Sequence, residues 1–398
     1  MQLKDINIEE KFVFKSNLKF VSLFLMLIGI TAITIAFFTD KERAWANILL
    51  NNYYFLSLAI GASFFLAIQY VTQSGWSVAF KRIPESLSSY IPIAGVIMIA
   101  VFLFGMKYLY PWTNAEESGI FDEKEMQLIH HKSAYLNNGF FVIRLIVFFT
   151  LWIVLTKILK HFSIKEDIEG GLKFFHKSEF YSKVLIFVLA FTFTFATIDW
   201  VMSIEPIWYS TLFAVKNFVS AFYHSIAVIL LIAILLHSTG YLPFISKAHW
   251  HDFSKYLFIL SIIFAYLWYS QYMIIWYANI PEETQYFIYR RENFSQTLFI
   301  VNLILNFVIP FIVLLPNYLA KKKSVLIFIA LILLLGHYTD LYEQIVPATC
   351  GVLKIGFIEI GIYLGFAGLF IFLVGKTLSK INLIPQNHPY LEESLKHF

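Results

Sequence analysis

Ten apolar stretches, each about as long as a bilayer is thick, constrain this chain more than any other feature of its sequence. A hydrocarbon core about 30 Å thick needs roughly 20 apolar residues of helix, because each residue adds about 1.5 Å. Only 14% of the residues are charged. The sequence therefore predicts an all-α integral membrane protein with about ten transmembrane helices. We expect them near residues 18–38, 53–71, 90–110, 139–159, 182–204, 212–236, 255–277, 295–315, 324–344 and 356–376.

Two other interpretations of these apolar stretches, a β-barrel and a signal peptide, fit the sequence less well. A closed barrel needs strands of about ten residues that alternate apolar with polar, and Val325 to Leu335 do not alternate. The first stretch, Leu18 to Phe38, is longer than the core of a signal peptide and has no small-residue cleavage motif after it. No linker rich in Pro, Gly or Ser divides the chain. We therefore expect a single polytopic membrane domain over residues 1–398.

The basic residues predict the orientation of the chain. Segments on the side of the two termini hold 15 Lys or Arg, whereas the loops on the other side hold 7. The positive-inside rule then places both termini in the cytoplasm. Because these residues sort by loop and form no patch, we expect no nucleic-acid partner. The single cysteine, Cys350, supports neither a thiol-ligated iron–sulfur cluster nor a covalently attached haem, so any such centre must belong to a partner.

Ionisable side chains at membrane depth are the main functional candidates. Each costs roughly 2.5 kcal/mol or more near the bilayer centre unless it has a partner or a role. Asp199 lies near the outer end of helix five, and Lys216, near the outer end of helix six, is its expected counter-ion. Asn217, Ser220 and His224 follow on the same helix and share one face, because steps of three, four and seven residues keep side chains on the same side. The Asp199–Lys216 pair either holds the two helices together or handles protons.

Helix nine carries a polar stripe of four residues that cannot face lipid: His337, Asp340, Glu343 and Gln344. Three of them are titratable, which suits a proton relay that leads to the outer surface. The same groups could instead hold helices together by hydrogen bonds. His224 and His337 could also bind a haem between their helices, an alternative that only this one pair supports.

Further polar and aromatic residues lie near these candidates in the outer half of the membrane. Aromatic walls with a few hydrogen-bonding groups suit a quinone ring, although Trp and Tyr at helix ends also form interfacial belts. Glu359 adds a carboxylate in helix ten. The acidic loop 111–138 is either a solvated loop or a docking surface, and loop 160–181 is expected to be an amphipathic connector. The residues that could line a quinone site or polar cluster are Arg144, Trp200, Gln271, Trp276 and Glu282.

Two segments carry a family resemblance. The first runs from Asp199 to Phe213 and begins Asp-Trp-Val-Met-Ser-Ile-Glu-Pro, and the second runs from Ser270 to Thr284. They resemble the ActF-type membrane subunit of bacterial alternative complex III, a quinol:cytochrome c oxidoreductase. That subunit is related to NrfD-like and polysulfide-reductase membrane anchors.

The resemblance implies two four-helix bundles, helices two to five and six to nine, flanked by the first and last helices. It implies a place in the bacterial inner membrane beside a sister NrfD-like membrane subunit, an external iron–sulfur subunit and c-type cytochromes. Iron–sulfur clusters and haem c would reside in those partners and no cofactor in this chain, although a quinone could bind here. The catalytic quinol pocket of related complexes is assigned to the sister subunit, so the implied role is structural and proton-conducting. The implied proton-handling residues are Asp199, Lys216, His224, His337, Asp340 and Glu343.

Two alternatives remain. An ion-coupled secondary transporter also uses buried ionisable residues, but it tends to place them at mid-membrane on broken helices. Here the helices near the charges read as mostly unbroken, with Pro206, Pro281 and Pro347 at helix ends and Pro310 inside helix eight. A scaffold without any proton role is the second alternative.

Overall fold

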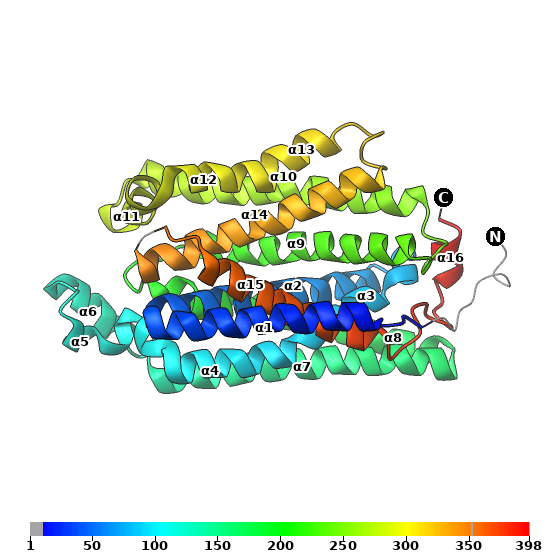
Figure 1. Cartoon of the computed structure of the whole chain (residues 1–398), viewed down its shortest axis with the longest axis horizontal. Coiled ribbons are helices and arrows are strands. Elements are labelled where there is room, and N and C mark those ends of the chain that lie inside the picture. Colours follow the sequence, from blue (N-terminus) through cyan, green and yellow to red (C-terminus); the bar gives the residue numbers. More distant parts are fainter. Residues whose placement is uncertain (1–10, 352, 398) are drawn as a thin grey trace.

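The computed structural model describes residues 11–351 and 353–397, and in this part of the chain ten helical segments are long and apolar enough to cross a membrane. They run side by side along the long axis of the molecule (Figure 1), which confirms the predicted all-α architecture. The third segment joins α3 (Arg82–Leu87) to α4 (Ile91–Leu109), and the eighth joins α12 (Gln296–Leu303) to α13 (Ile309–Leu314). The others are α1 (Ser16–Thr39), α2 (Lys41–Val71), α7 (Asn138–Glu169), α8 (Leu172–Trp200), α9 (Thr211–Ser238), α10 (Lys247–Ala278), α14 (Lys323–Cys350) and α15 (Phe357–Leu378).

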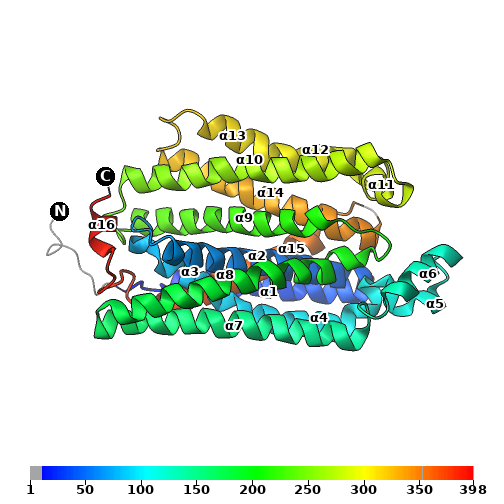
Figure 2. The ribbon, with the colours of Figure 1, turned by 180° about the vertical axis from the view of Figure 1, so that it is seen from behind.

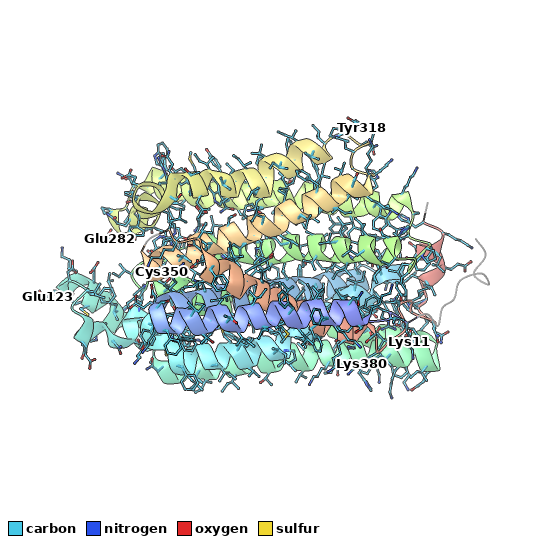
Figure 3. All side chains as sticks on the ribbon, in the orientation of Figure 1. Lys11, Glu123, Glu282, Tyr318, Cys350 and Lys380 are labelled. Atoms are coloured by element: carbon cyan, nitrogen blue, oxygen red, sulfur yellow. The ribbon has the colours of Figure 1, made fainter. Side chains whose placement is uncertain are left out.

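The two ends of the molecule carry different short elements. At one end, α5 (Ala115–Ser118), α6 (Glu123–Lys132) and α11 (Pro281–Ile288) extend beyond the spanning helices (Figure 2). At the other end lie α16 (Leu391–Leu395) and Lys11, which forms a backbone bridge to Asn382 (Figure 3). We call these the α11 end and the α16 end. Both described termini therefore lie at the same end, and the assignment of that end to the cytoplasm stays a prediction.

The spanning helices form two four-helix groups. The first contains α2, α4, α7 and α8, and the second contains α9, α10, α14 and the pair α12–α13. Helix α2 joins the groups because it packs on α9 and α14 as well as on α4 and α8. It is buried along most of its length, so its polar residues Asn47, Asn51 and Asn52 face protein rather than lipid.

The first and last spanning helices pack on each other beside the two groups. Their closest approach is at Gly29 on α1 and Gly365 on α15, where a Cβ atom on Gly29 would lie 2.3 Å from the Cα of Gly365. Small residues line the same face of α1, including Ser22, Ala32 and Ala36, all of them buried. Backbones can approach closely in this way only where side chains are minimal.

Two helix boundaries differ from the expected ones for identifiable reasons. Helix α2 begins at Lys41, a dozen residues early, because Asp40 caps it by accepting a hydrogen bond from the Arg43 backbone N–H. Helix α14 continues through Pro347 to Cys350 rather than ending near residue 344. Proline has no N–H for the carbonyl four residues earlier, which belongs to Glu343. That carbonyl instead accepts a hydrogen bond from Arg290 Nε at 2.8 Å.

Candidate functional site

The predicted polar faces of α9 and α14 meet inside the second helix group. Lys216 Nζ donates to Asp340 Oδ1 at 2.7 Å, and both side chains are almost fully buried. Asp340 Oδ2 also accepts a hydrogen bond from Gln344 Nε2 at 3.0 Å, one helical turn further along α14. The ammonium and the carboxylate therefore compensate each other's charge in a region with little access to water.

Two asparagines on the eighth spanning segment connect the carboxylates to the histidines. Asn302 Nδ2 lies 3.0 Å from Asp340 Oδ1 and 2.7 Å from Glu343 Oε2, so it bridges the two carboxylates. Asn306 donates to Asn302 Oδ1 at 2.6 Å, and its own Oδ1 lies 2.8 Å from Nε2 of His224. Sequence inspection missed both residues, although two asparagines spaced by four in an apolar span are a visible signal.

The backbone near Asn306 makes room for its side chain on both helices. Residues Ile304–Val308 form a π-helical turn, a wider helix that is often found at functional sites. On α14, a Cβ atom at Gly336 would lie 2.4 Å from Asn306 Oδ1. The absence of a side chain at residue 336 therefore leaves the space that the asparagine occupies.

His224 and His337 stack on each other near the middle of their helices. Their ring centroids are 4.3 Å apart and the rings are nearly parallel. His337 is held by Ser57 Oγ on α2 at 2.7 Å and by Ser220 Oγ on α9 at 3.3 Å, and His224 Nδ1 lies 2.7 Å from the Ser220 carbonyl. A haem iron bound between two helices needs two ring nitrogens that face each other across a gap. The two stacked rings do not have this arrangement.

A small cavity lies beside the carboxylates, toward the α11 end. Its volume is about 20 Å³, enough for about one water molecule. Lys216, Asp340 and Arg290 are among the residues that line it. Three buried polar atoms in its wall have no hydrogen-bond partner among the described residues: Gln271 Nε2, Glu343 Oε1 and Gln344 Oε1. A water molecule bound there would satisfy them, because buried polar groups are nearly always hydrogen-bonded.

Asp199 belongs to a separate cluster in the first helix group. Arg144 on α7 binds its carboxylate through two nitrogens, Nε at 2.7 Å and Nη2 at 3.1 Å. The guanidinium also lies over the rings of Tyr135 and Phe140. The predicted pairing of Asp199 with Lys216 is therefore wrong. Adjacent helix ends do not determine which faces meet, and Lys216 faces α14 rather than α8.

The remaining predicted lining residues lie at different places. Trp200 is fully buried and stacks on Phe149 in the first group, with no partner for its indole N–H among the described residues. Gln271 lines the small cavity. The structure does not bring Trp276 or Glu282 to either cluster, because Trp276 is 60% exposed on the outer face of α10 and Glu282 is exposed on α11.

A third polar cluster, which sequence inspection missed, lies at the α16 end. Lys81 binds Glu166 at 3.0 Å, and Arg82 binds both Glu85 and Asp167. All but Asp167 are essentially inaccessible to solvent. The expectation that loop 160–181 is a plain connector is wrong, because α7 and α8 extend through most of it and carry these carboxylates inward. The signals available in the sequence were the basic pair at residues 81–82, followed by Glu85, and the acidic pair at residues 166–167.

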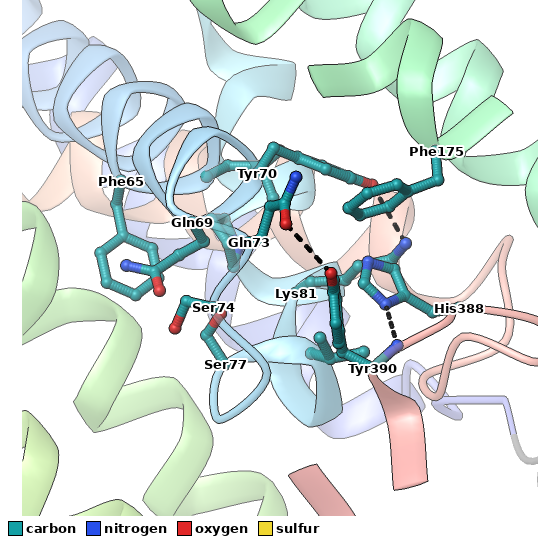
Figure 4. A pocket seen from close by; sticks show the side chains of 13 residues that line it. Phe65, Gln69, Tyr70, Gln73, Ser74, Ser77, Lys81, Phe175, His388 and Tyr390 are labelled. Carbon is teal, nitrogen blue, oxygen red and sulfur yellow. Dashed lines mark hydrogen bonds between the residues drawn. The ribbon is translucent and has the colours of Figure 1, made fainter. Parts of the chain in front are cut away.

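The C-terminal segment covers this third cluster. The Gln386 backbone N–H donates to Asp167, and His388 packs between Tyr70 and Phe175 beside Lys81 (Figure 4). Burial, together with Lys81 and Arg82, lowers the pKa of His388 to about 2. This histidine is therefore neutral under physiological conditions.

The last spanning helix of each group carries the same spacing at its α11 end. Asp199 precedes Pro206 by seven residues, and Asp340 precedes Pro347 by seven. Each aspartate is buried and paired with a basic residue of its own group, Arg144 in the first and Lys216 in the second. The two groups thus share a buried aspartate with a basic partner, although Pro206 lies beyond the end of α8 and Pro347 lies inside α14. Of these two aspartates it is Asp340 that is linked through asparagines to the histidine pair.

Comparison of the chain with models of known protein families and with curated proteins gives no match. The case for a function therefore rests on the geometry of these clusters and on the resemblance carried by residues 199–213 and 270–284.

Proposed function

We propose that this chain is a membrane subunit of a respiratory quinol:cytochrome c oxidoreductase of the alternative complex III type, in which it holds the assembly together and conducts protons toward the outer face. The observation that carries the proposal is a continuous row of hydrogen-bonded groups. It runs from Ser57 to His337, through Ser220 to His224, and through Asn306 and Asn302 to Asp340 and Glu343. Four members of this row can titrate, namely His337, His224, Asp340 and Glu343, and chains of Asp, Glu and His at membrane depth are typical of proton relays.

The row has a direction. It begins near the middle of α14 at His337 and runs toward the α11 end, where Glu343 borders the small cavity. With both termini in the cytoplasm, as the basic residues predict, the α11 end faces outward. Protons that enter the row would therefore leave on the outer side.

Along α2, the row extends to one side only. Toward the α16 end, Ser63 donates to the Ala59 carbonyl of its own helix. The next polar contact along α2 is from Gln69 to Tyr256, twelve residues and about 18 Å beyond Ser57. This gap favours release of protons to one side over conduction through the whole membrane.

Electron transfer is assigned to partners. The resemblance implies an external iron–sulfur subunit, c-type cytochromes and a sister membrane subunit that holds the catalytic quinol pocket. In this division of labour the protein resides in a bacterial inner membrane and does not catalyse a reaction alone.

Gentle detergent purification through a tag on the carboxyl terminus tests the proposal. We expect an iron–sulfur protein and c-type cytochromes to co-purify and to give c-type haem bands in the visible spectrum. A colourless protein that stays intact and solitary would overturn the proposal.

That second outcome would favour an ion-coupled secondary transporter. One structural observation supports this alternative more strongly than the sequence does. The helices near the charges are interrupted. The eighth segment contains the π-helical turn Ile304–Val308, and Pro347 lies inside α14. Transporters place ion sites at such discontinuities.

A further inference from the structure

The small inner cavity lies close to a much larger groove at the α11 end. The groove has a volume of about 460 Å³ and is bordered by residues 204–208, by α11 and by the loop that carries α6. Tyr286 lines both spaces, with one face stacked on Trp208 at 3.9 Å and Arg290 over the other at 3.4 Å. The wall between the cavity and the groove is therefore about one side chain thick.

Arg290 closes this wall from the inside. Its side chain is 3% exposed and lines the cavity. Three of its hydrogen bonds go to backbone carbonyls, those of Tyr286, Glu343 and Gln344. One of these carbonyls, that of Glu343, is available because Pro347 leaves it without its helical donor. These hydrogen bonds thus fix the guanidinium beside Glu343, whose carboxylate ends the row of hydrogen-bonded groups described above.

Glu205 holds the same guanidinium from the outside. Its Oε1 lies 2.5 Å from Arg290 Nη2, its side chain is 28% exposed, and it lines the groove. Burial alone would lower the pKa of Arg290, but the Glu205 carboxylate raises it above its ordinary value. Glu205 is also the member of the pair that can reach water, and its departure leaves the buried Arg290 guanidinium without its counter-ion.

We propose that the Arg290–Glu205 ion pair is a gate between the inner cavity and the outer groove, so that water and protons pass between Glu343 and the outside only when the pair separates. Without Glu205, the guanidinium is a buried cation whose charge is no longer compensated. Such a group moves toward solvent where its side chain is long enough to reach it. The vacated space then joins the cavity to the groove. The role of protons in this gate rests on the proposed function, whereas the access of water to the cavity does not.

Cysteine accessibility measures that access directly. The chain has one native cysteine, so Cys350→Ser gives a cysteine-free background, and Gln271→Cys then places a thiol on the cavity wall. The probe is a small, charged methanethiosulfonate added at the α11 side of membranes that contain the full chain. The rate of modification is read from the mass of the chain.

We expect the cavity thiol to react slowly in the otherwise native chain and at least about tenfold faster with Glu205→Ala, because a buried ion pair that loses one partner is strongly destabilised. Glu205→Gln keeps the shape of the side chain and should give a smaller increase in the same direction. Glu282→Ala, which changes another carboxylate of the same groove, is the matched control and should leave the rate unchanged.

A second thiol separates gating from unfolding. Ser182 is fully buried on α8, so the thiol of a Ser182→Cys variant should remain unreactive in every background. Equal rates with and without Glu205→Ala, or a cavity thiol that already reacts as fast as Gln285→Cys in the open groove, would overturn the gate. Neither result bears on which proteins co-purify with the chain, so the proposed function stands or falls separately.

Discussion

Lys216 Nζ on α9 lies 2.7 Å from Asp340 Oδ1 on α14, and the side chains of both residues are at most 5% exposed. A buried pair of this kind is stabilising mainly in comparison with a state in which one of the two charges remains alone. The two residues also lie where the polar row meets the inner cavity. Their chemistry therefore affects both the stability of the second helix group and its proposed function.

Removing one member of this pair should destabilise the protein more than removing both. Lys216→Met leaves Asp340 without its cation, and we expect a loss of about 3 kcal/mol or more in the free energy of unfolding. The double variant Lys216→Met with Asp340→Asn is neutral, and the amide oxygen of residue 340 can still accept the hydrogen bond of Asn302 or of Gln344. Thermal unfolding in detergent should therefore place the double variant closer to the native protein. An equal or larger loss in the double variant would show that charge compensation is not what the pair provides.

Arg144→Lys should destabilise the protein although it keeps the charge. Lysine cannot bind Asp199 through two nitrogens in one plane, and it loses the stacking of the guanidinium on Tyr135 and Phe140. We expect a decrease of about 2 kcal/mol in the free energy of unfolding.

Arg43→Lys is the matched comparison for that variant. Arg43 also binds a carboxylate through two nitrogens, that of Glu359, but its side chain is 19% exposed. Water can replace part of what is lost there, so thermal unfolding should show a smaller effect than for Arg144→Lys. A larger effect of Arg43→Lys would contradict the importance assigned to burial.

Gly29→Ala should separate the first and last spanning helices. The new Cβ atom would meet the backbone of Gly365 at 2.3 Å, so α1 or α15 must shift along most of its length. We expect a loss on the order of 1–3 kcal/mol, as for overpacked interiors. Gly139→Ala is the control, because its Cβ atom would meet only Asn137 Oδ1 at 3.8 Å. Unfolding temperatures that fall equally for both variants would argue against the close contact.

His388 should make the protein less stable in mild acid. Its pKa is about 2 in the folded chain, whereas an unfolded histidine binds a proton below about pH 6.5. Since the unfolded state then binds more protons, stability is lost as the pH falls below that value, by about 1.4 kcal/mol at pH 5.5 relative to pH 7.5.

His388→Asn tests this dependence. Asparagine can still accept the hydrogen bond that His388 Nδ1 receives from the Tyr390 backbone N–H, but it does not titrate. Unfolding temperatures at the two pH values should differ less for this variant than for the native chain. His131 is exposed, so the control variant His131→Asn should leave the difference in unfolding temperature between the two pH values unchanged. A native pH dependence in His388→Asn would refute the assignment.

The spanning helices could be predicted from the sequence because burial in lipid imposes a length and an apolar composition that each segment shows locally. The positions of Asp199, Lys216, His337 and Asp340 along their helices followed from the same pattern, and their depth in the membrane stays a prediction. Which of them pair did not follow, because depth says nothing about the direction in which a helix face points. Arg144 reaches Asp199 through the packing of α7 on α8, a relationship between helices that no spacing in one helix reveals.

Two further features were hidden for other reasons. Asn302 and Asn306 carry no charge, so a search for ionisable residues passes over them, although they join the carboxylates to His224. Lys81 and Glu166 lie in segments that composition assigns to solvated loops. They are buried because α7 and α8 extend past the expected boundary and because the C-terminal segment covers the cluster they belong to.

The measurement that tests the central claim most directly is proton release by the assembled complex that carries Asp340→Asn. With the complex reconstituted in vesicles, quinol is added and cytochrome c reduction is followed together with acidification on the outer side. We predict a complex that is less stable to heat, because Lys216 loses its anion, but that assembles with native haem content. Its turnover and outward proton release should both fall at least about tenfold, since positioned proton-transfer groups contribute at least that much. Glu359→Gln, a buried carboxylate paired with Arg43 outside the polar row, should stay near the native rate. Native turnover and native proton release in the Asp340→Asn complex would contradict the account.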